Sequence, residues 1–339
     1  MKKLIVPLVV IALLGGTEFA ASRAENRIPE PLTWDTQFSQ DKATQLERWE
    51  EHLEVVITGS SVAQANIDPA LLSSLTSYST GYNAGLPSMT PRVWRQFLLD
   101  AVYRDHCPDL LIIAVDIRQF SDNKPGSDDQ LNRYFNSRGR LDYIGEEDFW
   151  RNAEEWLDSQ SALFRIRARL REPDRVVAWV WDVGEIGDWR YTNLTPEGRY
   201  QSNDDRTYEW SGESLERLRD GAFLDLSFGG KETAGLRGII DDARQRGVNV
   251  VLVETPTMQD HLSRALPGGS EDQARFTAVL EEVAVEYGVS LLRFPEMDNE
   301  AVYFSDYYHM NWTGVENLTT LLAEKINTLG LGQGVGVCR

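Results

Sequence analysis

Six apolar residues in a row follow Asp109, in the stretch Leu-Leu-Ile-Ile-Ala-Val that ends at Val115. A strand with one face in water alternates apolar and polar residues, which this stretch does not do. A continuously apolar strand is expected in a parallel sheet that has helices on both of its faces. The stretch therefore predicts an α/β fold.

Strand-like and helix-like segments alternate along the chain on both sides of this stretch. Segments with the composition of strands lie at 54–58, 77–82, 248–253 and 290–294. Segments whose apolar residues recur at helical spacing lie at 91–102, 233–246, 270–288 and 313–329. The last of these carries Thr313-x-x-Glu316 at its start. The alternation predicts a three-layer α/β/α, flavodoxin-like parallel sheet of about five strands.

Residues 120–232 break this alternation and are expected to form a large insertion after the third strand. An insertion at the carboxyl end of a strand projects over the crevice where such folds bind ligands, so we interpret it as a cap. Six of the ten tryptophans lie in it: Trp150, Trp156, Trp179, Trp181, Trp189 and Trp210. Most of them are expected to form the core of the cap itself, with one or two facing a ligand such as a sugar ring.

The same insertion holds a run of basic residues in an otherwise acidic protein. Its members are Arg165, Arg167, Arg169, Arg171 and Arg175. They either attract an anionic polysaccharide or lipid headgroup, or form a solvated helix face that pairs with Glu172 and Asp174. Charge runs are usually solvated faces, which favours the second interpretation.

The N-terminus has the features of an export signal. Two lysines precede an apolar run at 4–16, and small residues suited to cleavage follow up to Ala24. The run is shorter than the roughly 20 residues that a membrane-spanning helix needs. We interpret residues 1–24 as a signal peptide or a retained N-terminal membrane anchor, 25–52 as a connector, and 53–339 as the main domain with its cap. An extracytoplasmic location follows for either alternative.

The composition excludes some partners and cofactors. A formal net charge of −19 disfavours nucleic acids and anionic lipid surfaces as partners. Cysteines and histidines do not cluster at metal-ligand spacing, so neither a metal nor a cofactor is expected. Cys107 and Cys338 are predicted at the same edge of the sheet, where a disulfide and two free thiols both fit. Nothing in the sequence indicates an oligomeric state.

One of the four histidines, His309, stands in a pattern that suits a general base. It follows Asp306 by three residues, in a predicted loop directly before the last helix. A carboxylate on the same loop can hold one ring nitrogen and fix the tautomer, while the other nitrogen faces a nucleophile. The other three histidines lie in charged or polar segments, at His52, His106 and His261.

A nucleophile for this base is expected at the carboxyl end of the first strand, where Gly59-Ser60-Ser61 lies. The glycine permits a tight turn, and a helix that begins beyond the serine offers free N–H groups and a positive potential. The same serines can also act only as caps of that helix. From this motif alone, capping is the better explanation.

The strand order, the serine turn and Asp306-x-x-His309 together resemble the SGNH/GDSL hydrolase family. The resemblance covers roughly residues 53–120 and 233–329. Gly-Ser-Ser at 59–61 is similar to the first block of the family, usually Gly-Asp-Ser, which implies that Ser61 is the nucleophile. Ser-Asp-Tyr-Tyr-His-Met-Asn at 305–311 resembles the fifth block, which implies that His309 is the base and Asp306 the acid that orients it.

The second and third blocks depart from the family pattern. Asn-Ala-Gly-Leu-Pro-Ser at 83–88 occupies the second block and implies an oxyanion hole at the backbone N–H of Ser88, with Gly85 nearby, together with the N–H of Ser61. The third block, usually Gly-x-Asn-Asp, has Asp116 at the asparagine position. A carboxylate there repels an oxyanion unless it is turned away or protonated, and one lost oxyanion donor costs about 100- to 1,000-fold in turnover.

The resemblance implies a serine-dependent ester hydrolase or O-acyltransferase that acts through an acyl-enzyme on acylated envelope or extracellular glycans. The departures and the N-terminal segment resemble membrane-associated members of the family, and a transferase implies a membrane-bound partner that supplies the acyl group. The alternative is a catalytically inactive protein with the same fold that binds polysaccharide or assists envelope assembly. Asp116 supports the alternative, whereas the set of Ser61, Asp306 and His309 argues against it.

Overall fold

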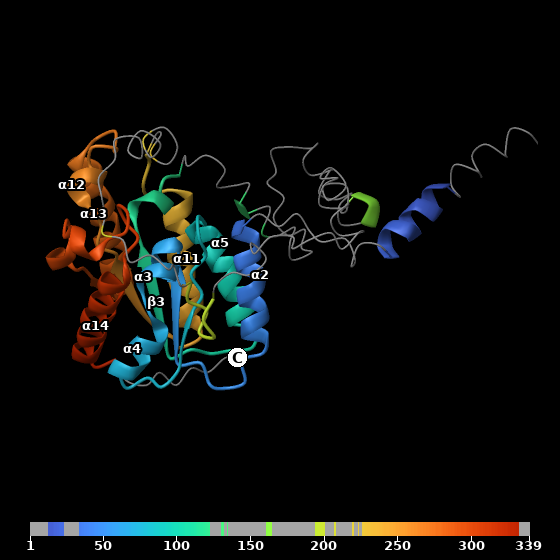
Figure 1. The fold of residues 1–339 in the computed structure, drawn as a ribbon, viewed down its shortest axis with the longest axis horizontal. Coiled ribbons are helices and arrows are strands. Elements are labelled where there is room, and N and C mark those ends of the chain that lie inside the picture. The colour runs from blue at the N-terminus through green and yellow to red at the C-terminus, as the bar shows by residue number, and fades with distance from the viewer. Residues whose placement is uncertain are drawn as a thin grey trace, which may run out of the picture. The chain divides into compact units, whose positions relative to one another are not determined.

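The computed structural model of the chain describes residues 13–23, 34–122, 130–131, 134, 161–164, 194–200, 207, 219, 223 and 226–331 (Figure 1). The chain divides into two compact units. One comprises residues 1–37 and 131–191, and the other comprises 38–130 and 192–339. The second unit contains the sheet and all the residues predicted for the site.

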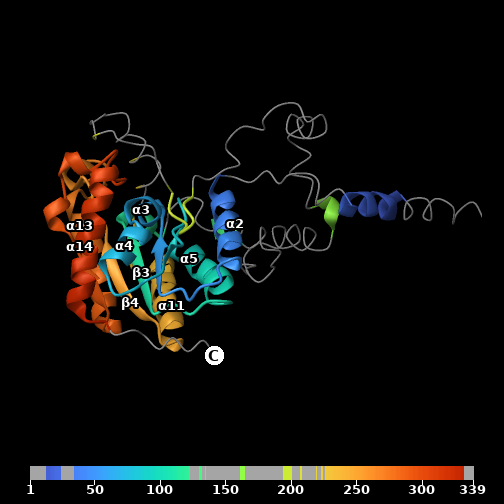
Figure 2. The same ribbon diagram turned by 60° about the horizontal axis from the view of Figure 1, so that its bottom comes forward.

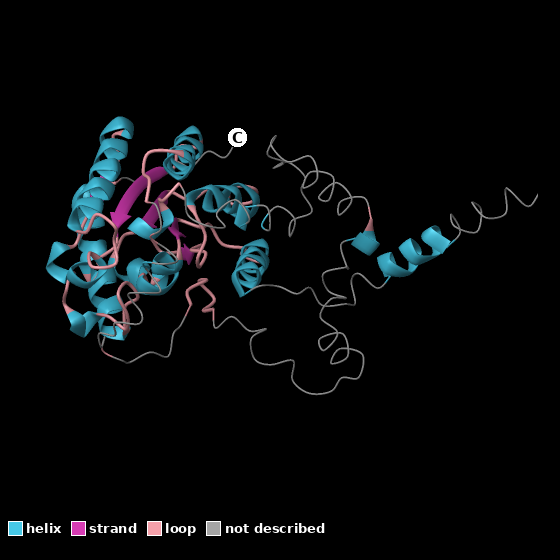
Figure 3. Ribbon diagram, turned by 90° about the horizontal axis from the view of Figure 1, so that it is seen from above, coloured by secondary structure: helices cyan, strands magenta, loops and turns pink. Residues whose placement is uncertain are grey.

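The second unit is built on a five-stranded sheet in which every pairing is parallel, in the order β2-β1-β3-β4-β5. The strands are β1 (Val55–Gly59), β2 (Gly81–Asn83), β3 (Leu110–Val115), β4 (Asn249–Glu254) and β5 (Ser290–Leu292). β3 pairs with β1 on one side and β4 on the other, and all six of its residues are buried. Helices surround the strands when the molecule is viewed from above (Figure 3). The predicted flavodoxin-like α/β fold is confirmed.

Helices pack on both faces of the sheet. On one face the apolar side chains of α3 (Ser61–Asn66), α4 (Pro69–Leu75) and α14 (Trp312–Leu329) form a single core with those of the strands. On the other face α5 (Pro91–Phe97) packs against α11 (Lys231–Gln245), with the strands between the two layers in Figure 2. α5 continues into a π-helical turn at Leu98–Val102, and α13 (Ser270–Tyr287) lies beside α11. The helices cover the two faces of the sheet, so the predicted site residues lie at the carboxyl ends of the strands.

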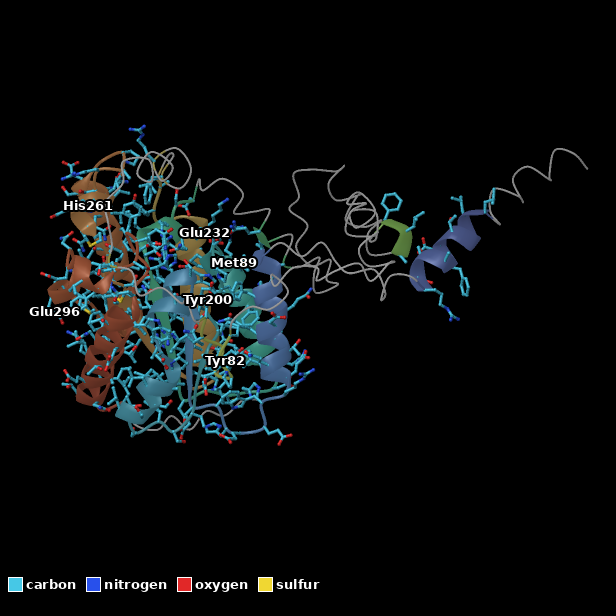
Figure 4. The ribbon with its side chains drawn as sticks, viewed as in Figure 1. Tyr82, Met89, Tyr200, Glu232, His261 and Glu296 are labelled. Atoms are coloured by element: carbon cyan, nitrogen blue, oxygen red, sulfur yellow. The ribbon has the colours of Figure 1, made fainter. Side chains whose placement is uncertain are left out.

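A helix that the sequence patterns did not predict, α2 (Trp34–Glu47), lies within the segment interpreted as a connector. From residue 38 on it belongs to the second unit, where Phe38 packs edge-to-face on Tyr200 with ring centroids 5.6 Å apart. Lys42 is fully buried and donates to the carbonyl of Asn83, and Tyr82 donates to Gln45 at 2.9 Å. Tyr82 and Tyr200 are labelled near α2 in Figure 4. The buried side of α2 therefore includes polar residues, which hides its helical pattern in the sequence.

The two ends of the predicted insertion meet at Asp122. Its backbone N–H donates to the carbonyl of Ser227 at 2.9 Å. Its carboxylate accepts from the N–H groups of Gly230 (2.8 Å) and Glu232 (3.0 Å) at the start of α11. At the β2 edge of the sheet, the backbone carbonyl of Glu197 accepts from the N–H of Asn83 at 2.8 Å. The six tryptophans and the arginine run lie outside the described residues.

The N-terminal prediction is only partly covered by the described residues. Residues 13–23 form a helix, and Glu18 accepts hydrogen bonds from the hydroxyl of Ser161 (2.6 Å) and the N–H of Ala162. Over the described ranges, no helix combines the length and the apolar character needed to cross a membrane. Cys107 is disulfide-bonded, and Cys338, the only other cysteine of the sequence, lies outside the described residues.

Candidate active site

The turn after β1 separates the roles of its two serines. Gly59 has φ of 146°, and a Cβ atom there would lie 2.1 Å from the carbonyl oxygen of Ala114 on β3, so only glycine fits. Ser60 is buried and is the N-cap of α3, where its Oγ accepts from the N–H of Val62 at 3.4 Å. Ser61 is therefore not needed as a cap. In the described part of the chain, neither its hydroxyl nor its N–H has a hydrogen-bond partner.

Asp306 and His309 are hydrogen-bonded to each other, as their spacing predicts. Nδ1 of His309 lies 2.7 Å from Oδ2 of Asp306. Oδ1 of Asp306 accepts from the backbone N–H groups of Tyr308 (2.9 Å) and His309 (2.7 Å). Burial alone would raise the pKa of Asp306, but the charge and hydrogen bonds of His309, with the N–H of Tyr308, lower that pKa to about 2. The carboxylate is therefore ionised, and Nε2 is left as the nitrogen that can accept a proton.

The loop that carries His309 is closed on itself. Phe304 and Met310 form an isolated antiparallel bridge, and the carbonyl of His309 accepts from the N–H of Ser305 at 2.9 Å. Directly after the loop, the side chain of Asn311 caps α14 by accepting from the N–H of Gly314 at 3.0 Å. The cap is thus Asn311, two residues before the Thr313-x-x-Glu316 motif.

Asn66, the last residue of α3, fixes this loop to the helix of Ser61. Its Nδ2 donates to the carbonyl of Tyr308 at 2.8 Å, and its Oδ1 accepts from the N–H of Met310 at 3.0 Å. The loop of Asp306 and His309 is therefore bonded to the last residue of the helix that Ser61 begins. Within the described residues, Ser61 and His309 are not hydrogen-bonded to each other.

The second block serves the site differently from what the resemblance implies. The N–H of Gly85 donates to Oδ1 of Asn83 at 3.0 Å and is not available to an oxyanion. A Cβ atom on Gly85 would lie 2.7 Å from the backbone nitrogen of Gln64, so the glycine lets the segment approach α3 closely. Ser88 is exposed and has φ of 61°, and its carbonyl accepts from Gln130 at 2.8 Å. The oxyanion role of Ser88, with Gly85 nearby, stays a prediction.

The carboxylate of Asp116 is turned toward Arg118. Oδ1 accepts from the backbone N–H (2.9 Å) and Nε (2.8 Å) of Arg118, and Oδ2 accepts from its Nη2 at 2.6 Å. The hydroxyl of Ser60 also donates to Oδ2 at 3.4 Å. Only 2% of the Asp116 side chain and 10% of the Arg118 side chain are exposed. The charge that was expected to oppose an oxyanion is therefore paired.

The sequence patterns missed three residues of this site: Asn66, Arg118 and Tyr308. The guanidinium carbon of Arg118 lies 3.3 Å from the centroid of the Tyr308 ring, and that ring meets the ring of His309 edge-on at 4.3 Å. Arginine two residues after a buried aspartate was the one available signal for this arrangement. In the described ranges, no group of three or more His, Cys, Asp or Glu residues could hold a metal ion.

One cavity of the second unit lies away from these residues. It is a cavity of about 410 Å³ between α12 (Gln259–Leu262) and α13, with Gln273, Glu281 and Arg293 among its lining residues. His261 in Figure 4 marks the position of α12. None of the predicted site residues lines this cavity.

Comparisons with known proteins find similarity in structure alone. No protein-family model and no curated protein matches the sequence. The chain is similar to a GDSL-like lipase from Bacteroides thetaiotaomicron, with 12% identity, a TM-score of 0.41, and coverage of 86% of this chain and 98% of the lipase. It is also similar to a carbohydrate acetylesterase from Sinorhizobium meliloti, with 12% identity, a TM-score of 0.37, and coverage of 82% of this chain and 99% of the acetylesterase. A third similar structure is phospholipase A1 from Streptomyces albidoflavus, with 9% identity, a TM-score of 0.38, and coverage of 81% of this chain and 99% of the phospholipase.

Proposed function

We propose that this chain is a serine-dependent ester hydrolase or O-acyltransferase that works through an acyl-enzyme. His309 takes the proton of Ser61, whose Oγ attacks the ester carbonyl, and the alcohol leaves with a proton from His309. Asp306 stabilises the imidazolium, and the N–H groups of Ser61 and Ser88 bind the oxyanion. Water or a second hydroxyl then attacks the acyl-enzyme and releases Ser61.

One observation carries this proposal. Asp306 binds Nδ1 of His309 at 2.7 Å, and the hydroxyl of Ser61 makes no hydrogen bond in the described part of the chain because Ser60 caps the helix. Asn66 joins the helix that Ser61 begins to the loop that carries Asp306 and His309. Hydrogen bonds between base and nucleophile are often long or absent before substrate binds. The proposal therefore requires the contact between Ser61 and His309 to form in the substrate complex.

An exposed aromatic side chain near the base supports an acylated carbohydrate as the substrate. Trp312 follows His309 by three residues and is 39% exposed. The guanidinium carbon of Arg199 lies 4.8 Å from the centroid of its ring, and Arg199 is itself buried and bonded to Asp68 at 2.7 Å. An indole fixed in this way offers a rigid apolar surface with a polar edge, against which the apolar face of a sugar ring can pack. Because the N-terminus is predicted to direct export, we propose that these glycans are extracytoplasmic.

A fluorophosphonate probe tests the proposal directly, because it forms a covalent bond with an activated serine. The purified chain is expected to be labelled at Ser61, as located by mass spectrometry of the digested protein. Ser61→Ala abolishes labelling, and His309→Ala slows it by at least 100-fold. His261→Ala is the matched control, since His261 lies on α12 outside the site, and it labels at the wild-type rate.

Failure of folded wild-type protein to label at Ser61 overturns the proposal and favours the inactive, polysaccharide-binding alternative. If Ser61 is labelled, an acetylated xylan or glucan distinguishes the two activities. Release of acetate to water identifies a hydrolase, and transfer of labelled acetyl to an added oligosaccharide identifies a transferase. Trp312→Ala is expected to raise KM for these glycans without changing the labelling rate.

A further inference from the structure

We propose that Arg118 is a positioning residue of this site, which joins the turn of Ser61 to the loop of His309. The inference rests on the proposed function, because it concerns the same serine and histidine. It differs from that proposal in assigning a role to a residue that neither the spacing nor the family resemblance singles out.

The connection of Arg118 to the nucleophile passes through Asp116. The Nε and Nη2 atoms of Arg118 bind the two oxygens of Asp116 side by side, at 2.8 and 2.6 Å. Oδ2 of Asp116 also accepts from Ser60, the residue directly before Ser61. A bidentate pair of this kind fixes direction as well as distance. These bonds fix the position of Arg118 relative to the turn that carries Ser61.

The connection of Arg118 to the base passes through Tyr308. The guanidinium lies over the Tyr308 ring at 3.3 Å, and the edge-on contact of that ring with His309 is 4.3 Å. The main chain of Tyr308 is fixed on both sides, by its N–H to Asp306 and by its carbonyl to Asn66. The Tyr308 ring therefore has little freedom to move away from the cation or from the imidazole. Arg118 restrains the imidazole through this ring.

The charge of Arg118 persists in the folded protein. Burial alone would lower the pKa of Arg118, but the negative charges around it, Asp116 first, raise that pKa above its ordinary value, so the side chain stays cationic. The ion pair with Asp116 and the contact of the cation with the Tyr308 ring therefore both persist at neutral pH.

The rate and the half-saturating probe concentration of fluorophosphonate labelling at Ser61 test this role. Arg118→Met removes the guanidinium and keeps an apolar stem, and Asp116→Asn with Arg118→Met removes both charges, so that no unpaired carboxylate is buried. In both variants the maximal rate of labelling is expected to fall about tenfold at an unchanged half-saturating probe concentration, because the imidazole is less well oriented. Arg118→Lys keeps the charge but not the bidentate geometry, and it is expected to recover only part of the rate.

Arg92→Met provides the matched control. Arg92 also forms a buried pair, with Glu232 at 2.9 Å, but this pair joins α5 to α11. This variant is expected to lose stability without a change in the maximal rate of labelling. Wild-type labelling combined with an unchanged maximal rate in both Arg118 variants overturns the inference and leaves the proposed function standing. Absence of labelling in the wild-type protein overturns the proposed function instead.

Discussion

The side-chain amide of Asn66 is bonded to the main chain on both sides of His309. It donates to the carbonyl of Tyr308 at 2.8 Å and accepts from the N–H of Met310 at 3.0 Å. Asn66 is buried and ends the same short helix that Ser61 begins. One side chain therefore fixes the loop of His309 relative to the helix that Ser61 begins.

Asn66→Ala is expected to separate these two parts of the site. It leaves two backbone groups without their partner, and each such group costs about 1–3 kcal/mol where it stays buried. We expect the free energy of unfolding to fall by at least about 2 kcal/mol in urea denaturation, and labelling of Ser61 to slow at least tenfold. Asn317→Ala, which removes an exposed bond to Thr313 on α14, is the control and should change neither quantity. Equal effects of the two variants would contradict this assignment.

Gly59→Ala is expected to disrupt the turn before Ser61. The added Cβ atom would meet the carbonyl of Ala114 at 2.1 Å, and strand β3 cannot retreat because it pairs with β4 on its other side. The variant should fail to fold or lose its cooperative thermal transition. Gly229 has a positive φ of 96° but nothing within 4 Å of its Cβ position. Gly229→Ala should therefore cost only the backbone strain, about 1–3 kcal/mol. A Gly59→Ala variant as stable as the Gly229→Ala variant would refute the steric argument.

Lys42 is expected to make stability rise with pH. Its burial lowers its pKa well below the ordinary value of 10.5, so the folded chain releases a proton that the unfolded chain retains. The cost of that release shrinks as the pH rises toward 10.5. Wild-type protein should gain unfolding free energy between pH 7 and about 9.5, and Lys42→Met should lose this slope. Lys325→Met, at a half-buried position on α14, should keep the wild-type slope in urea denaturation.

Asp306→Asn is expected to change stability in acid and labelling near neutral pH. Because the pKa of Asp306 is lowered to about 2, its ionised form stabilises the fold above pH 4, and this contribution is lost as the pH falls through 2. Wild type and variant should therefore differ most above pH 4 and converge near pH 2 in thermal unfolding. At pH 7 the variant should label at least 100-fold more slowly, since the amide cannot stabilise the imidazolium. A constant difference in stability from pH 2 to 7 would exclude the ionised carboxylate as its source.

The sheet could be predicted from the sequence because β3 is buried on both faces, and such a strand consists of apolar residues only. The helix α2 could not be predicted, because Ser39 and Lys42 occupy its buried side and break the apolar spacing. The turn of Gly59 shows a different limit. Sequence alone left the two serines as equal candidates for capping, and only the backbone geometry at Ser60 assigns that task.

The pair of Asp306 and His309 could be predicted because both residues lie on one short loop. Asn66 could not, since its bond to Tyr308 joins residues 242 positions apart. Arg118 is near Asp116 in sequence, but its contact with Tyr308 depends on how β3 and the last loop meet. Contacts of this kind depend on how distant segments are placed by the fold, and the local pattern of one sequence does not reveal that placement.

The closure of the insertion at Asp122 bears on how chains of this fold could diversify. Because Asp122 binds Ser227 and the first turn of α11, the strand leading into the insertion and the helix leading out of it are fastened to each other. The entropy of a closed loop grows only slowly with its length, so a longer or shorter insertion costs little. A segment of another length can therefore replace residues 123–193, provided that Glu197 keeps its bond to Asn83 and Arg199 its bond to Asp68.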